Sequence, residues 1–89
     1  MKSFILYGGA IADRDELHET LAMGLGFPEY YGKNLDALHD CLTDIFEETE
    51  IVVMNSAELS DNLGDYASRF IRVLRHSAEE NENLRVIIE

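Results

Sequence analysis

The chain is poor in cysteine, proline and basic residues. It contains one cysteine, Cys41, one proline, Pro28, and seven Lys and Arg residues against eighteen Asp and Glu residues. A single cysteine excludes an intramolecular disulfide and suits a reducing compartment. No apolar run approaches the roughly 18 residues of a membrane span, and the N-terminal segment lacks the pattern of a signal peptide. We therefore expect a cytoplasmic protein.

The shortage of basic residues leaves a formal net charge of −11 on 89 residues. Nucleic acids and anionic membranes both bind surfaces rich in Lys and Arg, so neither is an expected partner of this acidic chain. The charge is also unevenly distributed. Nine acidic residues and no Lys or Arg lie between Asn34 and Ser68, whereas four of the seven basic residues lie in the last third of the chain. A polarised molecule that binds a basic partner is the prediction.

The length and a hydrophobic content of 46% predict one domain, spanning residues 1–89. Short β-branched and aromatic runs predict strands at Lys2–Tyr7, Ile51–Met54 and Leu84–Ile88. Two helical patterns lie between each consecutive pair of strands. The order β-α-α-β-α-α-β indicates an α/β fold, in which helices pack against a three-stranded parallel sheet. The nearly continuous apolar run of the first strand predicts burial on both of its faces.

Capping residues mark the expected helix ends. Asp13 and Glu16 form a capping box at the first helix, and Asn55 with Glu58 is a similar signal before a short helix. Gly64 is expected to close that helix. In the last helix, Arg75 and Glu79 have the spacing of an ion pair.

The segment after the first helix has the most informative pattern. Asn34 is an expected N-cap, and the apolar residues that follow recur at helical spacing, at Leu35, Leu38, Leu42 and Ile45. Three aspartates fall together on the opposite side of this helix, and His39 and Thr43 flank them. These aspartates, which we name the acidic row, are Asp36, Asp40 and Asp44. Like charges at this spacing repel, so the row is either a solvated surface or a binding surface for cations of a partner.

The sequence gives little support for a catalytic site or a metal site. Cys41 falls at the edge of the apolar stripe and is interpreted as a small hydrophobic residue. Gly8-Gly9 lacks a phosphate-binding motif. Asp36, His39 and Asp40 offer metal-ligand atoms, but the spacings of known metal motifs are missing. We expect no enzyme activity, no catalytic residue, no metal and no cofactor.

A binding surface fits the pattern better than a reaction centre does. Tyr30 and Tyr31 precede the acidic helix, and aromatic residues beside charges are typical of protein interfaces. One of these two tyrosines is expected to be buried and the other exposed. His18, in the first helix, is expected to be an ordinary surface or half-buried histidine.

The segment Pro28–Thr43 resembles the sequence P-E-Y-Y-G-x-N-L-D-A-L-x-D-C-L-T of the barstar family, intracellular inhibitors of a secreted bacterial ribonuclease. The opening strand, the D-E-L-H-x-T-L of the first helix, and the VLR…VII of the last helix and strand fall where barstar has them. The resemblance covers essentially the whole chain, most specifically in Pro28–Thr43 and weakly in Ala57–Ser68.

The resemblance implies that the second helix and the preceding loop plug the active site of a nuclease. It implies that Asp40 replaces an RNA phosphate among catalytic Arg and His residues, that Asp36 pairs with another arginine, and that Tyr30 lies against the catalytic histidine. Asn34, Leu35 and Thr43 would complete the contact. The predicted partner-binding residues are Tyr30, Tyr31, Gly32, Asn34, Leu35, Asp36, His39, Asp40, Thr43, Asp44 and His76.

The chain also departs from the barstar pattern. His39 replaces a tryptophan, Asp44 and Ile45 replace a glycine and a tryptophan, and His76 replaces a glutamate. Barstar's second cysteine and its cis-proline have no counterpart. We predict an inhibitor of a basic small ribonuclease of the barnase type, monomeric when free. Two alternatives are an acidic regulatory module that binds another basic protein, and a metal-dependent enzyme or sensor that uses Asp36, His39 and Asp40.

Overall fold

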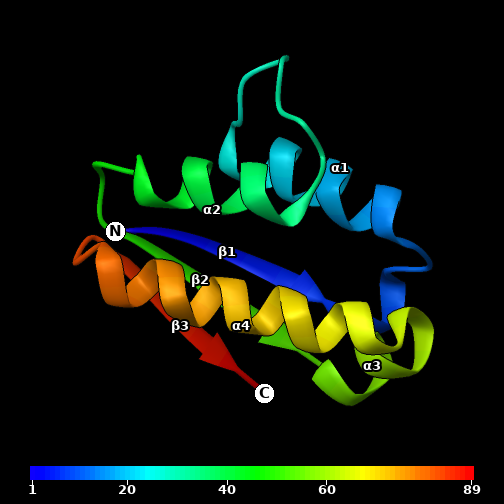
Figure 1. Cartoon of the computed structure of the whole chain (residues 1–89). Coiled ribbons are helices and arrows are strands. Elements are labelled where there is room, and N and C mark those ends of the chain that lie inside the picture. Colours follow the sequence, from blue (N-terminus) through cyan, green and yellow to red (C-terminus); the bar gives the residue numbers. More distant parts are fainter.

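The computed structural model describes all residues, 1–89, as an α/β fold (Figure 1). Its elements, in chain order, are β1 (Lys2–Tyr7), a 3₁₀ turn η1 (Gly8–Ala10), α1 (Arg14–Leu25), α2 (Leu35–Thr43), β2 (Thr49–Met54), α3 (Ser56–Leu63), α4 (Asp65–Glu80) and β3 (Leu84–Ile88). The predicted order and the three strands are confirmed. The second strand begins two residues earlier than predicted, at Thr49.

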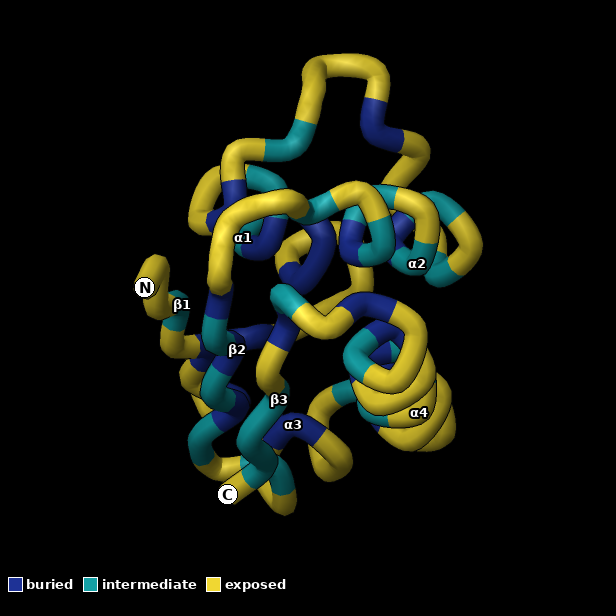
Figure 2. The backbone as a smooth tube through the Cα atoms, turned by 90° about the vertical axis from the view of Figure 1, so that its left-hand side faces the viewer, coloured by how far each residue is buried: buried dark blue, intermediate teal, exposed yellow.

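The three strands are parallel and lie in the order β1-β2-β3, so β2 is the central strand. α2 and α4 lie to one side of the strands (Figure 2). The buried strand residues alternate with residues that are less buried, as they do in a sheet with one covered face. The covered face contributes Leu6, Thr49, Ile51, Val53 and Leu84 to the buried interior.

The other face of the sheet remains largely open, which corrects the expectation that β1 is buried on both faces. Ile5 is 44% exposed and Tyr7 is 55% exposed. Ile5 is aligned with Val52, and Val52 with Ile87, so these three apolar residues form one row across the open face. The prediction was wrong because an apolar run shows that a strand is hydrophobic but not how many layers cover it.

α1 packs closely on the covered face of the sheet. Leu17 and Leu21 are fully buried, and a Cβ at Gly24 would overlap the ring of Phe4, so only glycine allows this approach. The predicted capping of α1 is confirmed, because an Asp13 carboxylate oxygen accepts from the Glu16 N–H at 2.8 Å. Glu16 in turn accepts from the N–H of Ala12 rather than from Asp13. No helix combines the length and the hydropathy that crossing a bilayer requires.

Two smaller predictions at the helix ends need correction. Asn55 precedes α3 but makes no side-chain capping bond, because it adopts the left-handed conformation with φ 57° and its backbone carbonyl accepts from Glu58 instead. Glu79 Oε2 lies 3.9 Å from His76 Nδ1, and Glu79 makes no ion pair with Arg75. Gly64 closes α3 with φ 62°, as predicted.

Candidate functional site

The acidic row lies on the solvent side of α2 because the opposite side is tied to the core. Leu38 and Leu42 are fully buried, which places Asp36, Asp40 and Asp44 on the surface. The Asn34 side chain accepts from the Ala37 N–H at 2.8 Å, which confirms the predicted N-cap. None of the ion pairs within 4 Å in this protein includes a residue of the acidic row. The three carboxylates therefore repel one another without an ion pair to relieve the repulsion. Arg72 and His76 line a hollow with Asp36 and Asp40 but lie beyond ion-pair distance.

The position of α2 is set by the C-terminal end of α4. The His39 imidazole contacts Ser77 Oγ through Nδ1 at 3.0 Å and Glu80 Oε2 through Nε2 at 2.9 Å. The buried Asn81 amide donates to the backbone carbonyls of Leu42 and Ile45, each at 2.9 Å. Leu42 lies in the last turn of α2 and Ile45 just beyond it, where a helix end has few intrahelical donors, so these bonds supply further ones. His39 and Asn81 thus anchor α2 from a segment about 40 residues further along the chain.

Both ring nitrogens of His39 contact residues of α4. This arrangement argues against a metal site formed by Asp36, His39 and Asp40. A histidine ligates a metal through a ring nitrogen whose lone pair is free. No group of three or more His, Cys, Asp or Glu side chains is arranged to hold a metal ion. In this arrangement His39 supports α2 and is not available as a ligand beside Asp36 and Asp40.

The loop between α1 and α2 projects from the body of the protein (Figures 1 and 2). Tyr30 is 88% exposed and Tyr31 is 8% exposed, which confirms the expectation that one tyrosine is buried and one exposed. The Tyr31 hydroxyl lies 2.6 Å from His18 Nδ1, and its ring lies 4.9 Å from that of Phe27. Because Tyr31 is anchored inward, its neighbour Tyr30 extends into solvent.

His18 corrects a second expectation, because it is fully buried rather than at the surface. Its Nε2 lies 2.7 Å from the hydroxyl of Tyr66 in α4, so the imidazole joins α1, the loop and α4. Burial lowers the pKa of His18 and raises those of Tyr31 and Tyr66. All three side chains are therefore neutral near pH 7, with one imidazole nitrogen donating and the other accepting. The sequence did not reveal the two tyrosine partners of His18, because they lie 13 and 48 residues away along the chain.

The remaining predicted site residues have different environments. Gly32 and Asn34 are exposed, whereas Leu35 and Thr43 are half-buried. The Thr43 hydroxyl donates to the backbone carbonyl of His39 at 2.9 Å, so it is satisfied within α2. His76 is exposed on α4. The exposed predicted residues belong to the loop, to α2 and to α4.

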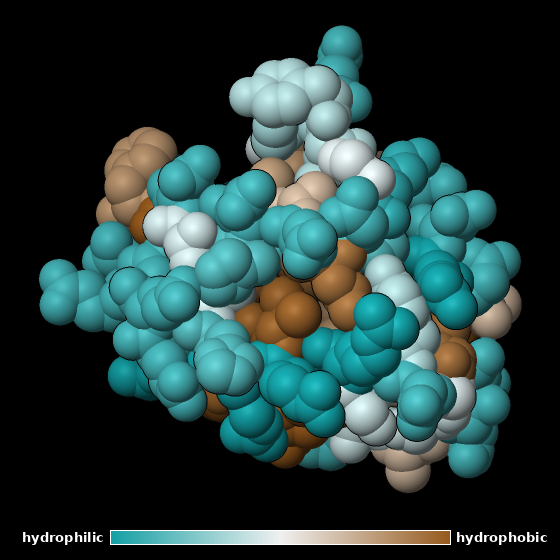
Figure 3. All heavy atoms as spheres, in the orientation of Figure 1, coloured by the Kyte–Doolittle hydropathy of each residue, from teal (hydrophilic) through white to brown (hydrophobic).

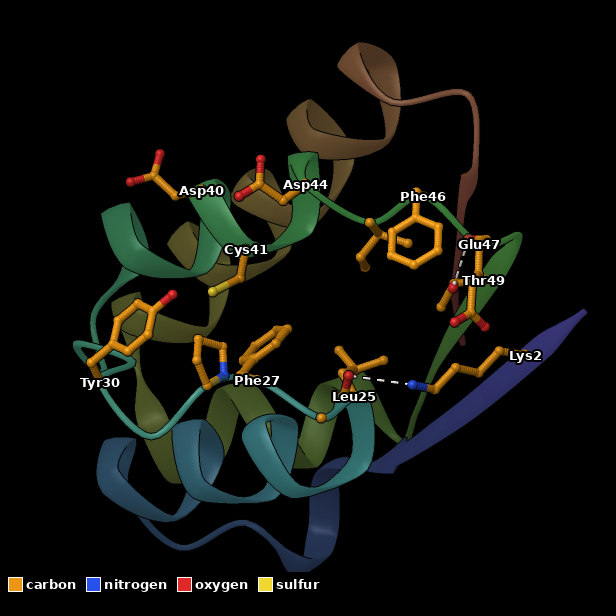
Figure 4. A pocket seen from close by; sticks show the side chains of 13 residues that line it. Lys2, Leu25, Phe27, Tyr30, Asp40, Cys41, Asp44, Phe46, Glu47 and Thr49 are labelled. Carbon is orange, nitrogen blue, oxygen red and sulfur yellow. Dashed lines mark hydrogen bonds between the residues drawn. The ribbon is translucent and has the colours of Figure 1, made fainter.

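A groove of about 630 Å³ lies beside the acidic row, between the loop and the C-terminal half of α2 (Figure 4). Phe27, Cys41 and Phe46 line it and were not predicted as site residues. Phe46 continues the helical spacing of the apolar stripe, four residues after Leu42, yet it is 84% exposed because α2 ends at Thr43. The sequence alone therefore did not mark it as a surface residue. Burial raises the pKa of the Cys41 thiol, and the nearby Asp44 and Asp40 carboxylates raise it further.

The fold and the site define an α/β protein that presents an acidic helix whose aspartates make no ion pair within the chain. The chain belongs to the barstar family, as the family model described as "Barstar (barnase inhibitor)" matches residues 1–89. It is also similar to a Bacillus subtilis (strain 168) protein named "Putative ribonuclease inhibitor YrdF". The two are 37% identical over 91 residues, an alignment that covers 100% of each chain. The family predicted from Pro28–Thr43 is confirmed.

Proposed function

We propose that this protein inhibits a basic ribonuclease of the barnase type by placing α2 and the preceding loop in the active site of the enzyme. Family membership and the relative named as a ribonuclease inhibitor support inhibition of a ribonuclease. The main structural support for this mode of inhibition is the acidic row, whose three exposed carboxylates have no cation within 4 Å.

The chemistry of the acidic row suits a site that binds RNA phosphates. A carboxylate presents two anionic oxygens to Arg, Lys or protonated His, as a phosphate does, and an arginine binds either group with two parallel hydrogen bonds. In the proposed complex Asp40 occupies the phosphate position, Asp36 pairs with a second arginine, and Tyr30 lies on a catalytic side chain. Inhibition then needs no covalent step, no catalytic residue and no cofactor on this chain.

The internal bonds of the site favour tight binding. Asn81 and His39 hold α2, and the contact between His18 and Tyr31 holds the base of the loop. A partner therefore meets a helix and a loop that are already ordered, which reduces the conformational entropy lost on binding. Complex formation also relieves the repulsion within the acidic row, because cations of the enzyme neutralise it.

The proposal predicts stoichiometric inhibition that depends on Asp40. We expect the protein to abolish RNA cleavage by barnase, or by another small basic ribonuclease in a panel, near a one-to-one ratio. Asp40→Ala should raise the Kd of that complex at least about thirtyfold, as loss of a central interface anchor does. The measurement is RNA cleavage against inhibitor concentration.

Glu58→Ala is the matched control, because Glu58 is an exposed acidic residue on α3 and lies off the proposed contact surface. It should change the Kd by less than about twofold. Undiminished RNA cleavage by every enzyme of the panel, at any ratio, contradicts the proposed function. Equal effects of the two substitutions contradict the role given to Asp40.

A further inference from the structure

We infer that the groove beside the acidic row is a binding pocket for an arginine side chain carried by the partner. The inference deepens the proposed function and rests on it for the identity of the partner. It adds a second contact region, centred on Phe46, to the region that the acidic row provides.

The floor of the groove is apolar. Phe27 and Pro28 come from the loop, Cys41 comes from α2, and Ile45 comes from the segment that follows α2. The Cys41 side chain faces the groove (Figure 4). Phe46 stands at one end of the groove and Tyr30 at the other. An apolar stem about the length of an arginine side chain can lie on such a floor and keep its charged head in water.

The rim of the groove is anionic. Asp40, Asp44 and Glu47 line it, and none of them is paired with a cation of this chain. Lys2 is the only basic residue of the lining, and its Nζ lies 3.3 Å from the Leu25 carbonyl, to which it donates. The rim therefore favours a cationic occupant, as the acidic row does.

The exposed aromatic ring of Phe46 favours arginine among the cations. A planar guanidinium stacks on an aromatic face and at the same time donates hydrogen bonds to carboxylates in its plane, which an ammonium group cannot do. Phe46 supplies the ring, and its chain neighbours Asp44 and Glu47 line the same end of the groove with carboxylates. Figure 3, drawn in the orientation of Figure 1, shows a mainly hydrophilic surface with a hydrophobic hollow near its centre. Phe46 is one of the most exposed large apolar residues of the protein, at 84%.

The first test uses peptides and needs no ribonuclease. Acetyl-Gly-Arg-Gly-amide is titrated into the isotope-labelled protein and compared with the citrulline peptide, which has the same shape without the charge. We expect millimolar binding, the order of magnitude for a single side chain, with amide shifts gathered at Cys41, Ile45 and Phe46. Phe46→Ala should reduce the apparent affinity about fivefold. Equal shifts with citrulline, or shifts spread over the acidic residues of α3, overturn the inference.

The second test uses the complex with an inhibited ribonuclease. Phe46→Ala should weaken that complex about tenfold, because an aromatic residue is lost from the contact. Met23→Ala is the matched control, since Met23 is another exposed apolar residue, 86% exposed on α1 and outside the groove. Near-ultraviolet circular dichroism checks that both variants fold.

The outcomes separate the two proposals. If the unmodified protein inhibits a ribonuclease but Phe46→Ala and Met23→Ala behave alike, the groove inference fails while the proposed function stands. If no ribonuclease is inhibited, the proposed function fails, and the peptide titration alone decides whether the groove binds arginine.

Discussion

At the scale of single residues, His18 is a buried titratable group whose hydrogen bonds favour its neutral form. It is fully buried, and both of its ring nitrogens contact tyrosine hydroxyls, at 2.6 and 2.7 Å. A neutral imidazole fits this site because it donates from one nitrogen and accepts at the other. A protonated imidazole would bury a charge with no carboxylate in contact, and this cost is why burial lowers the pKa of His18.

The lowered pKa of His18 makes stability depend on pH. The unfolded chain binds a proton at His18 near the ordinary pKa of 6.5, whereas the folded chain binds it only at lower pH. The free energy of unfolding should therefore be highest above pH 6.5 and fall as the pH drops below it, by up to about 1.4 kcal/mol per pH unit from this residue. Urea unfolding between pH 5 and 7.5 measures the slope.

His18→Gln keeps a donor and an acceptor but does not titrate, so its unfolding free energy should vary less with pH than that of the unmodified protein. His76→Gln, at an exposed position, removes a histidine without changing a buried contact. It should keep the slope of the unmodified protein. A slope that is the same in all three proteins would show that His18 does not govern this pH dependence.

Some residue environments follow from the sequence and others do not. Leu38, Leu42 and the exposed Asp40 follow from helical periodicity, because burial along one helix repeats with the turn of that helix. The environment of His18 does not, since Tyr66 lies 48 residues away and meets it only after folding. Phe46 lies past the last turn of α2, where periodicity no longer describes the direction of a side chain.

At the scale of elements, α2 is a short helix whose support comes from outside itself. Its nine residues leave the last carbonyl groups short of donors, and the Asn81 amide donates to Leu42 in the last turn and to Ile45 just beyond the helix. His39 adds two contacts to α4. The repulsion in the acidic row works against this helix in isolation, because isolated helices of this length are marginal. Tertiary bonds therefore hold the acidic row in place.

Asn81→Asp should destabilise the protein strongly. An ionised aspartate cannot donate, so the Ile45 carbonyl loses its side-chain donor and the Leu42 carbonyl keeps only backbone donors. Both carbonyls then face a negative charge. We expect the free energy of unfolding to fall by about 2–4 kcal/mol, the range for buried polar groups left unpaired. Thermal and urea unfolding give the value.

Asn83→Asp introduces the same charge two residues away, where no side-chain hydrogen bond is lost. It should cost less than about 1 kcal/mol. If the two variants were equally destabilised, added charge and not the loss of the bonds to α2 would account for the effect.

The order and type of the elements were largely predictable, and their layering was not. Three strands separated by pairs of helices predicted a parallel sheet, because long connections favour parallel pairing. The open face of β1 was missed, since an apolar strand in a three-stranded sheet looks the same in sequence whether one face or both are covered. The groove was missed for a related reason. It forms between the loop and α2, and no single element predicts it.

At the scale of the whole molecule, charge opposes self-association. The net charge of −11 makes two copies repel each other. The open sheet face spans three strands of five or six residues, roughly 250 Å² from strand dimensions. This is well below the approximately 800 Å² that each partner buries in a stable interface. We therefore propose that the free protein is a monomer.

The same charge should govern association with a basic ribonuclease. The association rate constant should fall at least about tenfold between about 50 mM and 500 mM NaCl, because salt screens long-range attraction. The dissociation rate should change much less. Stopped-flow fluorescence with the enzyme in excess measures both rate constants.

Neutralising part of the acidic row by Asp36→Asn and Asp44→Asn should make the association rate less sensitive to salt. Glu58→Gln provides the comparison for the loss of a charge on α3. An association rate that is independent of salt would mean that the acidic row does not attract the partner from a distance.

The support of α2 by Asn81 also bears on how this protein is made. A nascent chain that has reached Thr49 already contains the whole acidic row, but Tyr66 and Asn81 have not yet been translated. The loop and α2 gain their final geometry only when the last quarter of the polypeptide leaves the ribosome. A product of premature termination would bear the same aspartates without the fixed spacing between them.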